Sequence, residues 1–225
     1  MLRALLFDFD GTIAQSEPLH YAAFAEVLAR RGIMLDEPCY YQRYLALTDR
    51  ECVGRMVQDF ERPDLRLDVA RLLREKSDAM AVRLARGVPL CPGVETFVAA
   101  AAARCALAIV SGALRIEIAT VLTRFGLEHF FPVIVSAEDV RAGKPDPEGY
   151  RLAVERLRAR GLPDLDVDQC LAVEDAPMGI AAARAAGIHV VALPHSFHAD
   201  ALGDADLVYS SYGAVEWRAL EALLA

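Results

Sequence analysis

The sequence predicts an α/β protein with a Rossmann-like parallel sheet core and a small all-α domain inserted into it. Three observations support this fold class. Short apolar runs alternate with amphipathic segments of helical length. The first apolar run is followed by a long stretch that contains only helical patterns. Finally, 55% of the residues are hydrophobic and the mean hydropathy is +0.25, which suits a sheet buried on both faces.

The expected strands are short β-type runs that end in small or polar residues, as buried parallel strands do. They lie at residues 4–9, 107–110, 132–135, 171–173 and 189–193. Amphipathic segments between them predict helices over residues 93–104, 115–125, 147–160 and 178–186. This alternating order of strands and helices is typical of an open, doubly wound sheet.

The long gap after the first strand predicts an inserted helical domain. Helical patterns cover residues 18–31, 50–60 and 68–86, and Pro18 stands where a first helical turn accepts proline. Gly87, Pro89 and Pro92 then interrupt helical continuity. We therefore expect a core domain of residues 1–16 and 88–225 and a helical domain of residues 17–87.

Composition excludes several classes of protein. A net charge of -8 opposes binding to nucleic acids or anionic membranes. The five cysteines are scattered and never form a CxxC pair, so neither a disulfide framework nor a zinc site is indicated. No run of 18 apolar residues occurs, and Asp8 interrupts the N-terminus too early for a signal peptide. We expect a cytoplasmic protein, a monomer or weak homodimer, that binds neither nucleic acid nor membrane.

Polar residues follow the expected strands and should meet at one edge of the sheet, where ligands bind in open α/β folds. They are Asp8, Asp10, Ser111, Lys144, Glu174 and Asp175. Several carboxylates in one crevice raise each other's pKa values unless a cation neutralises them. All the candidate ligands are oxygen donors, which favours Mg²⁺ over Zn²⁺.

The lysine and the hydroxyl suit a phosphoryl group. Lys144 supplies a point charge and Ser111 a hydrogen bond. Phosphate monoesters hydrolyse so slowly unaided that covalent catalysis together with a metal ion is a natural solution. In the stretch FDFDG, Gly11 permits the turn that would bring both aspartates to the same site.

These motifs resemble the haloacid dehalogenase-like superfamily. The carriers of the resemblance are FDFDGT at 7–12, Ser111 in VSGA, Lys144 in GKPDP, and VEDAPMGIAAARAAGI at 173–188. The helical insertion and the phrase EPLHYAAF at 17–24 are similar to the subgroup that contains β-phosphoglucomutase and phosphoglycolate phosphatase. The resemblance covers essentially the whole chain, and it implies that the insertion is a cap domain that closes over the core.

The resemblance implies a mechanism residue by residue. Asp8 would attack phosphorus and form an aspartyl-phosphate, while Asp10 would protonate the leaving oxygen and then activate water. Ser111 and Lys144 would hold the transferring phosphoryl group. Mg²⁺ would be bound by Asp8, the backbone carbonyl of Asp10, Asp175 and, directly or through water, Glu174.

The resemblance also implies substrate-binding residues. In the core these are Thr12, which should form a hydrogen bond within its loop, and Gly112 beside Ser111. In the cap, His20 matches a histidine that reaches the active site, and Arg50 and Lys76 resemble residues that bind a second anionic group of the substrate. Near the C-terminus, His195, His198 and Asp200 are interpreted as a polar loop rather than a metal cluster.

The leading hypothesis is a Mg²⁺-dependent phosphatase that acts on a small phosphorylated metabolite, a sugar phosphate or a phosphoglycolate-like compound. One alternative is a phosphomutase of the β-phosphoglucomutase type, which His20, Arg50 and Lys76 keep open. A dehalogenase or a phosphonatase is disfavoured because neither chemistry uses an acid at Asp10. From a different class, the chain could be a non-catalytic protein that binds a phosphorylated ligand.

Overall fold

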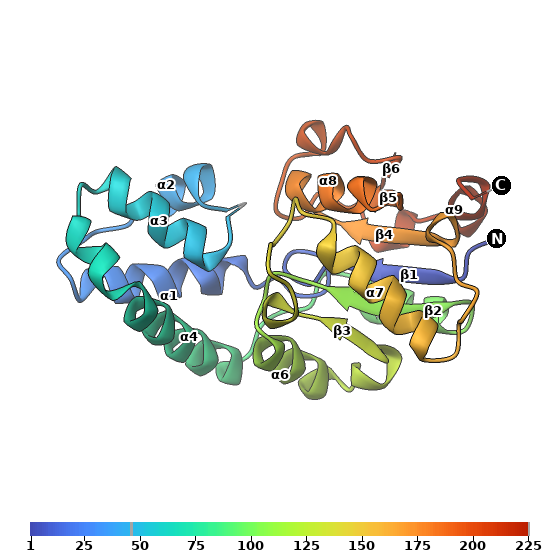
Figure 1. Ribbon diagram of the computed structural model, residues 1–225, viewed down its shortest axis with the longest axis horizontal. Coiled ribbons are helices and arrows are strands. Elements are labelled where there is room, and N and C mark those ends of the chain that lie inside the picture. Colours follow the sequence, from blue (N-terminus) through green and yellow to red (C-terminus); the bar gives the residue numbers. More distant parts are fainter. Residues whose placement is uncertain (46, 225) are drawn as a thin grey trace. The chain divides into compact units, whose positions relative to one another are not determined.

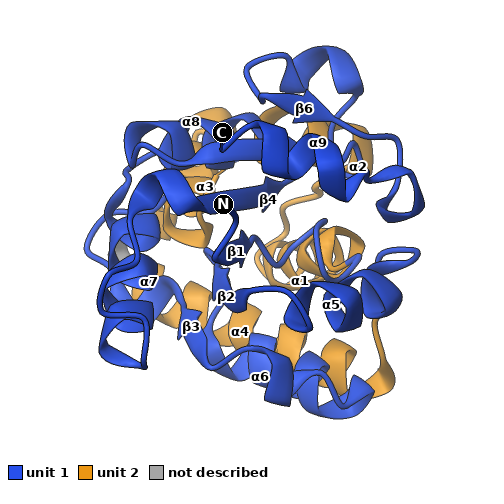
Figure 2. Cartoon of the chain, turned by 90° about the vertical axis from the view of Figure 1, so that its right-hand side faces the viewer, with its two compact units in different colours: residues 1–15, 89–225 blue, residues 16–88 orange. Residues whose placement is uncertain are grey.

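The computed structural model describes residues 1–45 and 47–224, except for the side chains of residues 66 and 67. The chain forms two compact units, one of Met1–Gln15 with Pro89–Ala225 and one of Ser16–Val88 (Figures 1 and 2). The first unit holds a sheet and the second is helical. No helix of the described residues is both long enough and apolar enough to cross a membrane.

Six parallel strands form the sheet of the first unit (Figure 1). They are β1 (Ala4–Phe7), β2 (Ala106–Val110), β3 (Val133–Val135), β4 (Cys170–Glu174), β5 (His189–Ala192) and β6 (Leu207–Val208). Their order is β3-β2-β1-β4-β5-β6, so the chain reverses its winding direction beside β1. The predicted fold class is therefore confirmed, and the region beyond the carboxyl ends of β1, β2 and β4 is where a ligand would bind.

Helices cover both faces of this sheet. They are α5 (Val94–Ala102), α6 (Arg115–Phe125), α7 (Glu148–Ala159), α8 (Pro177–Ala185) and α9 (Trp217–Ala222). Ala4 and Leu6 of β1 share a buried apolar cluster with residues of α7 and α8. Phe7 points to the other face, where its ring meets Phe97 of α5 and Phe131 edge-on at centroid distances of 6.1 and 5.8 Å. Burial on both faces explains why the strands read as continuous apolar runs.

Short 3-10 helices join several of these elements. They are η2 (Glu128–Phe130), η3 (Ala137–Asp139), η4 (Val167–Gln169), η5 (Ala199–Leu202) and η6 (Tyr212–Ala214). The first strand ends two residues before its predicted end at Phe9. The reason is that the Phe9 carbonyl accepts hydrogen bonds from the amides of Thr12, Ile13 and Ala14, which turns the chain out of the sheet.

In the part of the second unit that the structure describes there are four α-helices and one 3-10 helix. They are α1 (Glu17–Ala29), α2 (Glu37–Arg43), α3 (Asp49–Asp59), η1 (Pro63–Asp68) and α4 (Val69–Arg86). Pro18 lies in the first turn of α1, as predicted. Thr48 and Glu51 form a reciprocal capping box that begins α3. Helix α2 was not predicted, because seven residues are too few to show a helical period.

Candidate active site

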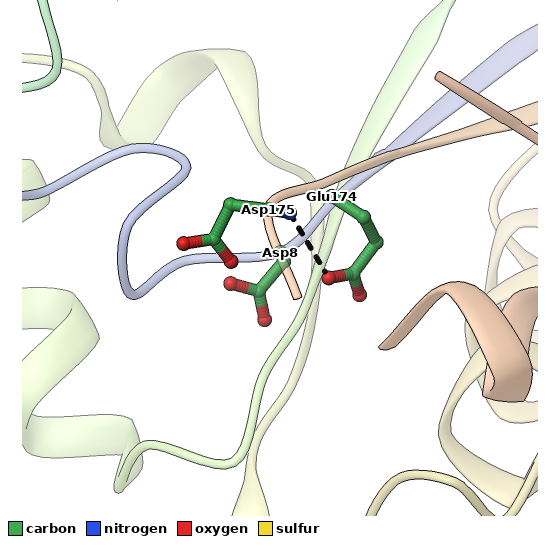
Figure 3. A group of neighbouring side chains, drawn as sticks. All are labelled: Asp8, Glu174 and Asp175. Carbon is green, nitrogen blue, oxygen red and sulfur yellow. Dashed lines mark hydrogen bonds between the residues drawn. The ribbon is translucent and has the colours of Figure 1, made fainter. Parts of the chain in front are cut away.

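Three carboxylates meet at the carboxyl ends of the central strands. Asp8 follows β1, Glu174 is the last residue of β4, and Asp175 comes next. Phe7 is in register with Val173, and the amide of Asp8 donates to the Val173 carbonyl over 2.9 Å, which places the acids of the two strands side by side. Carboxylate oxygens of all three residues lie within 4.8 Å of one another (Figure 3).

Lys144 joins two of these acids. Its Nζ donates a hydrogen bond to Oδ1 of Asp8 and another, of 2.7 Å, to Oε1 of Glu174. The hydroxyl of Tyr150, in α7, donates to the same Glu174 oxygen. The amide of Asp175 lies 3.4 Å from Oε2 of Glu174 (Figure 3). Glu174 thus holds the lysine in place beside Asp8.

The site carries more negative charge than its lysine balances. Burial, together with the charges of Glu174 and Asp10, raises the pKa of Asp8 to about 8 against the opposing effect of Lys144. Burial together with Asp8 and Glu174 also raises the pKa of Asp175 well above its usual range, against Ser196 and Lys144. Burial lowers the pKa of Lys144, but Asp8 and Glu174 outweigh it and keep the ammonium charged.

A tight turn that begins at Phe9 carries Asp10 and Gly11. Gly11 has a φ of +76°, and a Cβ atom there would lie 1.8 Å from Oδ2 of Asp175 and 2.2 Å from Oγ of Ser196. Only glycine fits, both for its backbone conformation and for the close approach of Asp175. Oγ of Ser111, which follows β2, lies 3.4 Å from Oδ2 of Asp10 and accepts a hydrogen bond from the Ala113 amide.

The acidic cluster has the character of a hard-cation site. Oδ2 of Asp175 is buried, and no group of the described residues donates to it in hydrogen-bonding geometry. A buried carboxylate oxygen without a donor is costly unless a cation binds it. All the donors are oxygens, as Mg²⁺ prefers. The residues present therefore fit a magnesium ion.

Two of the predicted substrate-binding residues, Thr12 and Gly112, belong to the core unit. Thr12 is completely buried. Its backbone amide donates to the Phe9 carbonyl over 3.3 Å, so the hydrogen bond of Thr12 within the loop is made by its backbone. Its Oγ1 has no hydrogen-bond partner in the described part of the chain, and its backbone carbonyl accepts from the Tyr212 hydroxyl over 2.9 Å. Gly112 is exposed beside Ser111, and a side chain there would meet no atom within 4 Å.

The predicted cap residues belong to the helical unit. Lys76 of α4 is fully buried, and its Nζ lies 2.7 Å from Oδ2 of Asp49 and 2.8 Å from Nδ1 of His20. The same ammonium lies 5.3 Å from the centre of the Phe24 ring. Arg50 is exposed on α3. The helical unit thus gathers His20 and Lys76 around Asp49, and the substrate roles of His20, Lys76 and Arg50 stay predictions.

Sequence reasoning missed several residues that hold the site together. Tyr150 binds Glu174, while Cys91, His195 and Tyr212 donate to backbone carbonyls of the turn at residues 11 and 12. Tyr150 lies six residues after Lys144, in the first turn of α7, and this closeness to the lysine was the signal in the sequence that could have found it. The other three come from distant segments of the chain, and no local pattern relates them to the turn.

The core is thus a parallel α/β sheet with a buried cluster of carboxylates and a lysine at the carboxyl ends of its central strands. Residues 5–193 match the haloacid dehalogenase-like hydrolases, and the chain belongs to this family. It is 30% identical over 220 residues to validoxylamine A 7'-phosphate phosphatase of Streptomyces hygroscopicus subsp. limoneus, which covers 96% of this chain and 97% of that protein.

Two further comparisons agree. The chain is 33% identical over 189 residues to fructose-1-phosphate phosphatase YqaB of Escherichia coli, with 83% of this chain and 94% of that protein covered. The crystal structure of CbbY from Rhodobacter sphaeroides in complex with phosphate superposes with a TM-score of 0.81 at 28% identity, over 94% of this chain and 95% of that chain. The chain is therefore classed among the phosphatases of the family.

Proposed function

We propose that this protein is a Mg²⁺-dependent phosphatase that hydrolyses a phosphate monoester of a small metabolite through an aspartyl-phosphate at Asp8. The observation that carries the proposal is the buried group of Asp8, Lys144, Glu174 and Asp175 at the carboxyl ends of β1 and β4. A sugar phosphate or a phosphoglycolate-like ester is the substrate class, and similarity to a fructose-1-phosphate phosphatase supports the sugar phosphate.

In the first half of the reaction, a carboxylate oxygen of Asp8 attacks phosphorus and the bond to the ester oxygen breaks. Lys144 orients the nucleophile through Oδ1 and contributes positive charge beside the phosphoryl group. Asp10 donates its proton to the departing oxygen, which leaves as an alcohol. Ser111 is placed beside Asp10 to hydrogen-bond a phosphoryl oxygen.

In the second half, Asp10 takes a proton from water, the water oxygen attacks phosphorus, and the bond to Asp8 breaks. Inorganic phosphate leaves and both aspartates return to their initial protonation states. Water activation and leaving-group protonation require one residue to act first as acid and then as base. Asp10, close to the nucleophile but outside its buried group of acids, suits that exchange.

The residues that would hold Mg²⁺ are Asp8, Asp175, the backbone carbonyl of Asp10 and, directly or through water, Glu174. Bound there, the ion supplies positive charge to the phosphoryl oxygens. The raised pKa values of Asp8 and Asp175 and the buried Oδ2 of Asp175 support this assignment. Glu174 already accepts from Lys144 and Tyr150, which makes it the ligand more suited to act through water.

The ion pair in the cap favours a phosphatase over a phosphomutase. A phosphomutase of this type works through a bisphosphate, so its cap needs a cation for the second phosphate. The ammonium of Lys76 is buried and already paired with Asp49 at 2.7 Å. Such a neutralised pair is a poor site for a second phosphate, which leaves the exposed Arg50, among the three predicted cap residues, for that role.

Replacing Asp8 by Asn tests the proposal. The variant keeps the shape of the side chain but removes the nucleophile, so Mg²⁺-dependent phosphate release should fall on the order of 10⁴-fold or more. The matched control is Asp168→Asn, an exposed acid at η4, which should retain full activity. Undiminished phosphate release by Asp8→Asn would rule out the proposed mechanism.

A screen of phosphorylated metabolites, each tested with Mg²⁺ and with a chelator, identifies the substrate class. A phosphatase releases inorganic phosphate from its preferred ester only with the metal. Incubation with β-glucose 1-phosphate and a bisphosphate primer tests the alternative, because a phosphomutase forms glucose 6-phosphate without comparable release of phosphate. Tight binding without turnover across the panel would instead indicate a non-catalytic binding protein.

A further inference from the structure

The carbonyl group of Gly11 is held by the side chain of His195, which is 184 residues away in the sequence. Nδ1 of His195 lies 2.9 Å from this oxygen, and Sγ of Cys91 lies 3.3 Å from it. A carbonyl oxygen can only accept, so the imidazole must carry a proton on Nδ1 and donate it. His195 therefore has a defined tautomer and a defined partner within the turn that carries Asp10.

The position of His195 is set by the sheet. After β5, the amide of Leu193 donates to the Glu174 carbonyl over 2.8 Å, which extends the pairing with β4 by one residue. The amide of His195 then donates to the Leu193 carbonyl over 2.9 Å, with Pro194 between them. This tight, proline-containing turn aims the imidazole back toward Gly11, and such a rigid support is what a positioning residue requires.

The next residue faces the same glycine. Oγ of Ser196 lies 2.2 Å from the point where a Gly11 Cβ would stand, and this hydroxyl lowers the pKa of Asp175. The two residues after Pro194 thus contact both the turn of Asp10 and the carboxylate of Asp175. Neither belongs to the four motifs that carry the resemblance to the family.

Asp10 stands between two anchored carbonyl groups. On one side the Phe9 carbonyl accepts three backbone amides of the turn. On the other side the Gly11 carbonyl accepts from His195. Because an acid must reach the leaving oxygen to within a hydrogen bond, loss of one anchor should misplace the proton donor and leave the nucleophile in position.

We propose that His195 is a positioning residue for the general acid Asp10, acting through its hydrogen bond to the Gly11 carbonyl. The inference rests on the proposed function, because it assumes that Asp10 protonates the leaving group. It predicts that loss of the His195 hydrogen bond slows the hydrolysis of some esters more than that of others. Esters of poor leaving groups, such as sugar phosphates, need the proton, whereas p-nitrophenyl phosphate expels a stable anion without it.

The experiment compares kcat/KM for fructose 1-phosphate and p-nitrophenyl phosphate in the Mg²⁺-loaded full-length protein. His195→Phe keeps a ring but removes the donor, and should lower kcat/KM about 5- to 10-fold for the sugar phosphate and less than about 2-fold for the aryl ester. His195→Asn places an amide donor where Nδ1 stands and should restore the sugar phosphate to within about 2-fold. His195→Gln, whose amide lies one bond further out, should not.

Two controls test whether the loss of activity in His195→Phe is specific to this position and whether it acts through Asp10. His189→Phe makes the same change at the opposite end of β5, where His189 lies 3.4 Å from Asp206, and should leave both substrates unaffected. In an Asp10→Asn background, His195→Phe should cost nothing further on the sugar phosphate, because both changes act on the same proton transfer.

The proposed role of His195 would be overturned if His195→Phe lowered kcat/KM equally for both substrates. It would also be overturned if His195→Asn failed to restore kcat/KM for the sugar phosphate. If His195→Phe does not fold, the contrast between Asn and Gln decides the question in the same way. If Asp10→Asn itself shows no preference for the aryl ester, the role of Asp10 in the proposed function is wrong, which is a distinct result.

Discussion

At the scale of single residues, the charges around Asp8 do not balance. Asp8, Glu174 and Asp175 lie together, and Lys144 is the cation that joins Asp8 to Glu174. Burial makes the excess negative charge expensive, which is why the pKa values of Asp8 and Asp175 are raised. The protein without metal should therefore bind a proton where the enzyme with metal binds a cation.

This competition predicts that a rise in pH lowers the Tm of the metal-free protein and increases the gain in Tm from Mg²⁺. The pKa of Asp8 is about 8 in the folded protein, against an ordinary value of 3.8 for a free aspartate side chain. The folded state thus holds a proton that the unfolded chain releases, so the stability from Asp8 is complete below about pH 4 and is lost as the pH rises toward 8. The Tm of the metal-free protein should fall on the order of ten degrees over this range.

Mg²⁺ should raise Tm more at pH 8 than at pH 5, because it binds the ionised carboxylates. Thermal unfolding in chelator and in Mg²⁺ at both pH values measures the difference. Asp8→Asn removes this titration and serves as the control. An equal gain from Mg²⁺ at pH 5 and pH 8 would contradict the prediction.

At the scale of elements, helix α8 is fitted closely to the site. A Cβ atom at Gly179 would lie 2.1 Å from the Glu174 carboxyl group. Glu174 cannot easily move, because it accepts from Lys144 and Tyr150. Alanine normally stabilises a helix relative to glycine, but here Gly179→Ala should lower the free energy of unfolding by about 2 kcal/mol and reduce activity.

The chain offers a matched control in α3. Gly54 is exposed in a helix interior, and a Cβ there would meet nothing within 4 Å. Gly54→Ala should raise the free energy of unfolding by about 0.5–1 kcal/mol. Chemical denaturation of both variants checks the pair. If Gly179→Ala also proved stabilising, α8 would not be fitted against Glu174 as described.

Strands and helices were predictable where the apolar pattern was long. The apolar runs that begin at residues 4, 107 and 171 identified β1, β2 and β4, because strands buried on both faces need uninterrupted apolar sequence. β6 was missed since it has two residues, and α9 was missed since it has six. Elements this short depend on their neighbours rather than on their own sequence.

The same distinction holds within the site. Residues that follow strands could be placed together from the sequence, as Asp8, Glu174 and Asp175 were. The residues that hold the turn at Gly11 could not, because Cys91, His195 and Tyr212 reach it from segments 80 to 200 residues away. Long-range contacts of this kind leave no local periodicity.

At the scale of the whole molecule, the core unit is discontinuous but its two ends meet. Ala14 pairs with Leu90 in an antiparallel bridge, and the amide of Gln15 donates to the Pro89 carbonyl over 2.9 Å. A two-residue Asn-Gly turn has the geometry to close such a pair of antiparallel segments. Residues 16–88 should therefore be replaceable by Asn-Gly with the core still folded.

Circular dichroism and thermal unfolding of the shortened chain check this expectation, with a single cooperative transition as the expected result. Deletion of residues 16–88 without the turn residues serves as the control and should be less stable, because it forces the two segments to join without a turn. A shortened chain with Asn-Gly that shows no cooperative transition would mean that the core depends on the helical unit to fold.

The central place of β1 also bears on how the chain folds during synthesis. β1 leaves the ribosome long before its partners in the sheet, β2 and β4, which begin at Ala106 and Cys170. The helical unit of residues 16–88 is contiguous and is made completely before either partner. In a growing chain, domains fold as their residues emerge. The strand that leads to Asp8 therefore waits, unpaired, while the helical unit forms, and the group of Asp8, Glu174 and Asp175 assembles only after β4 has been made.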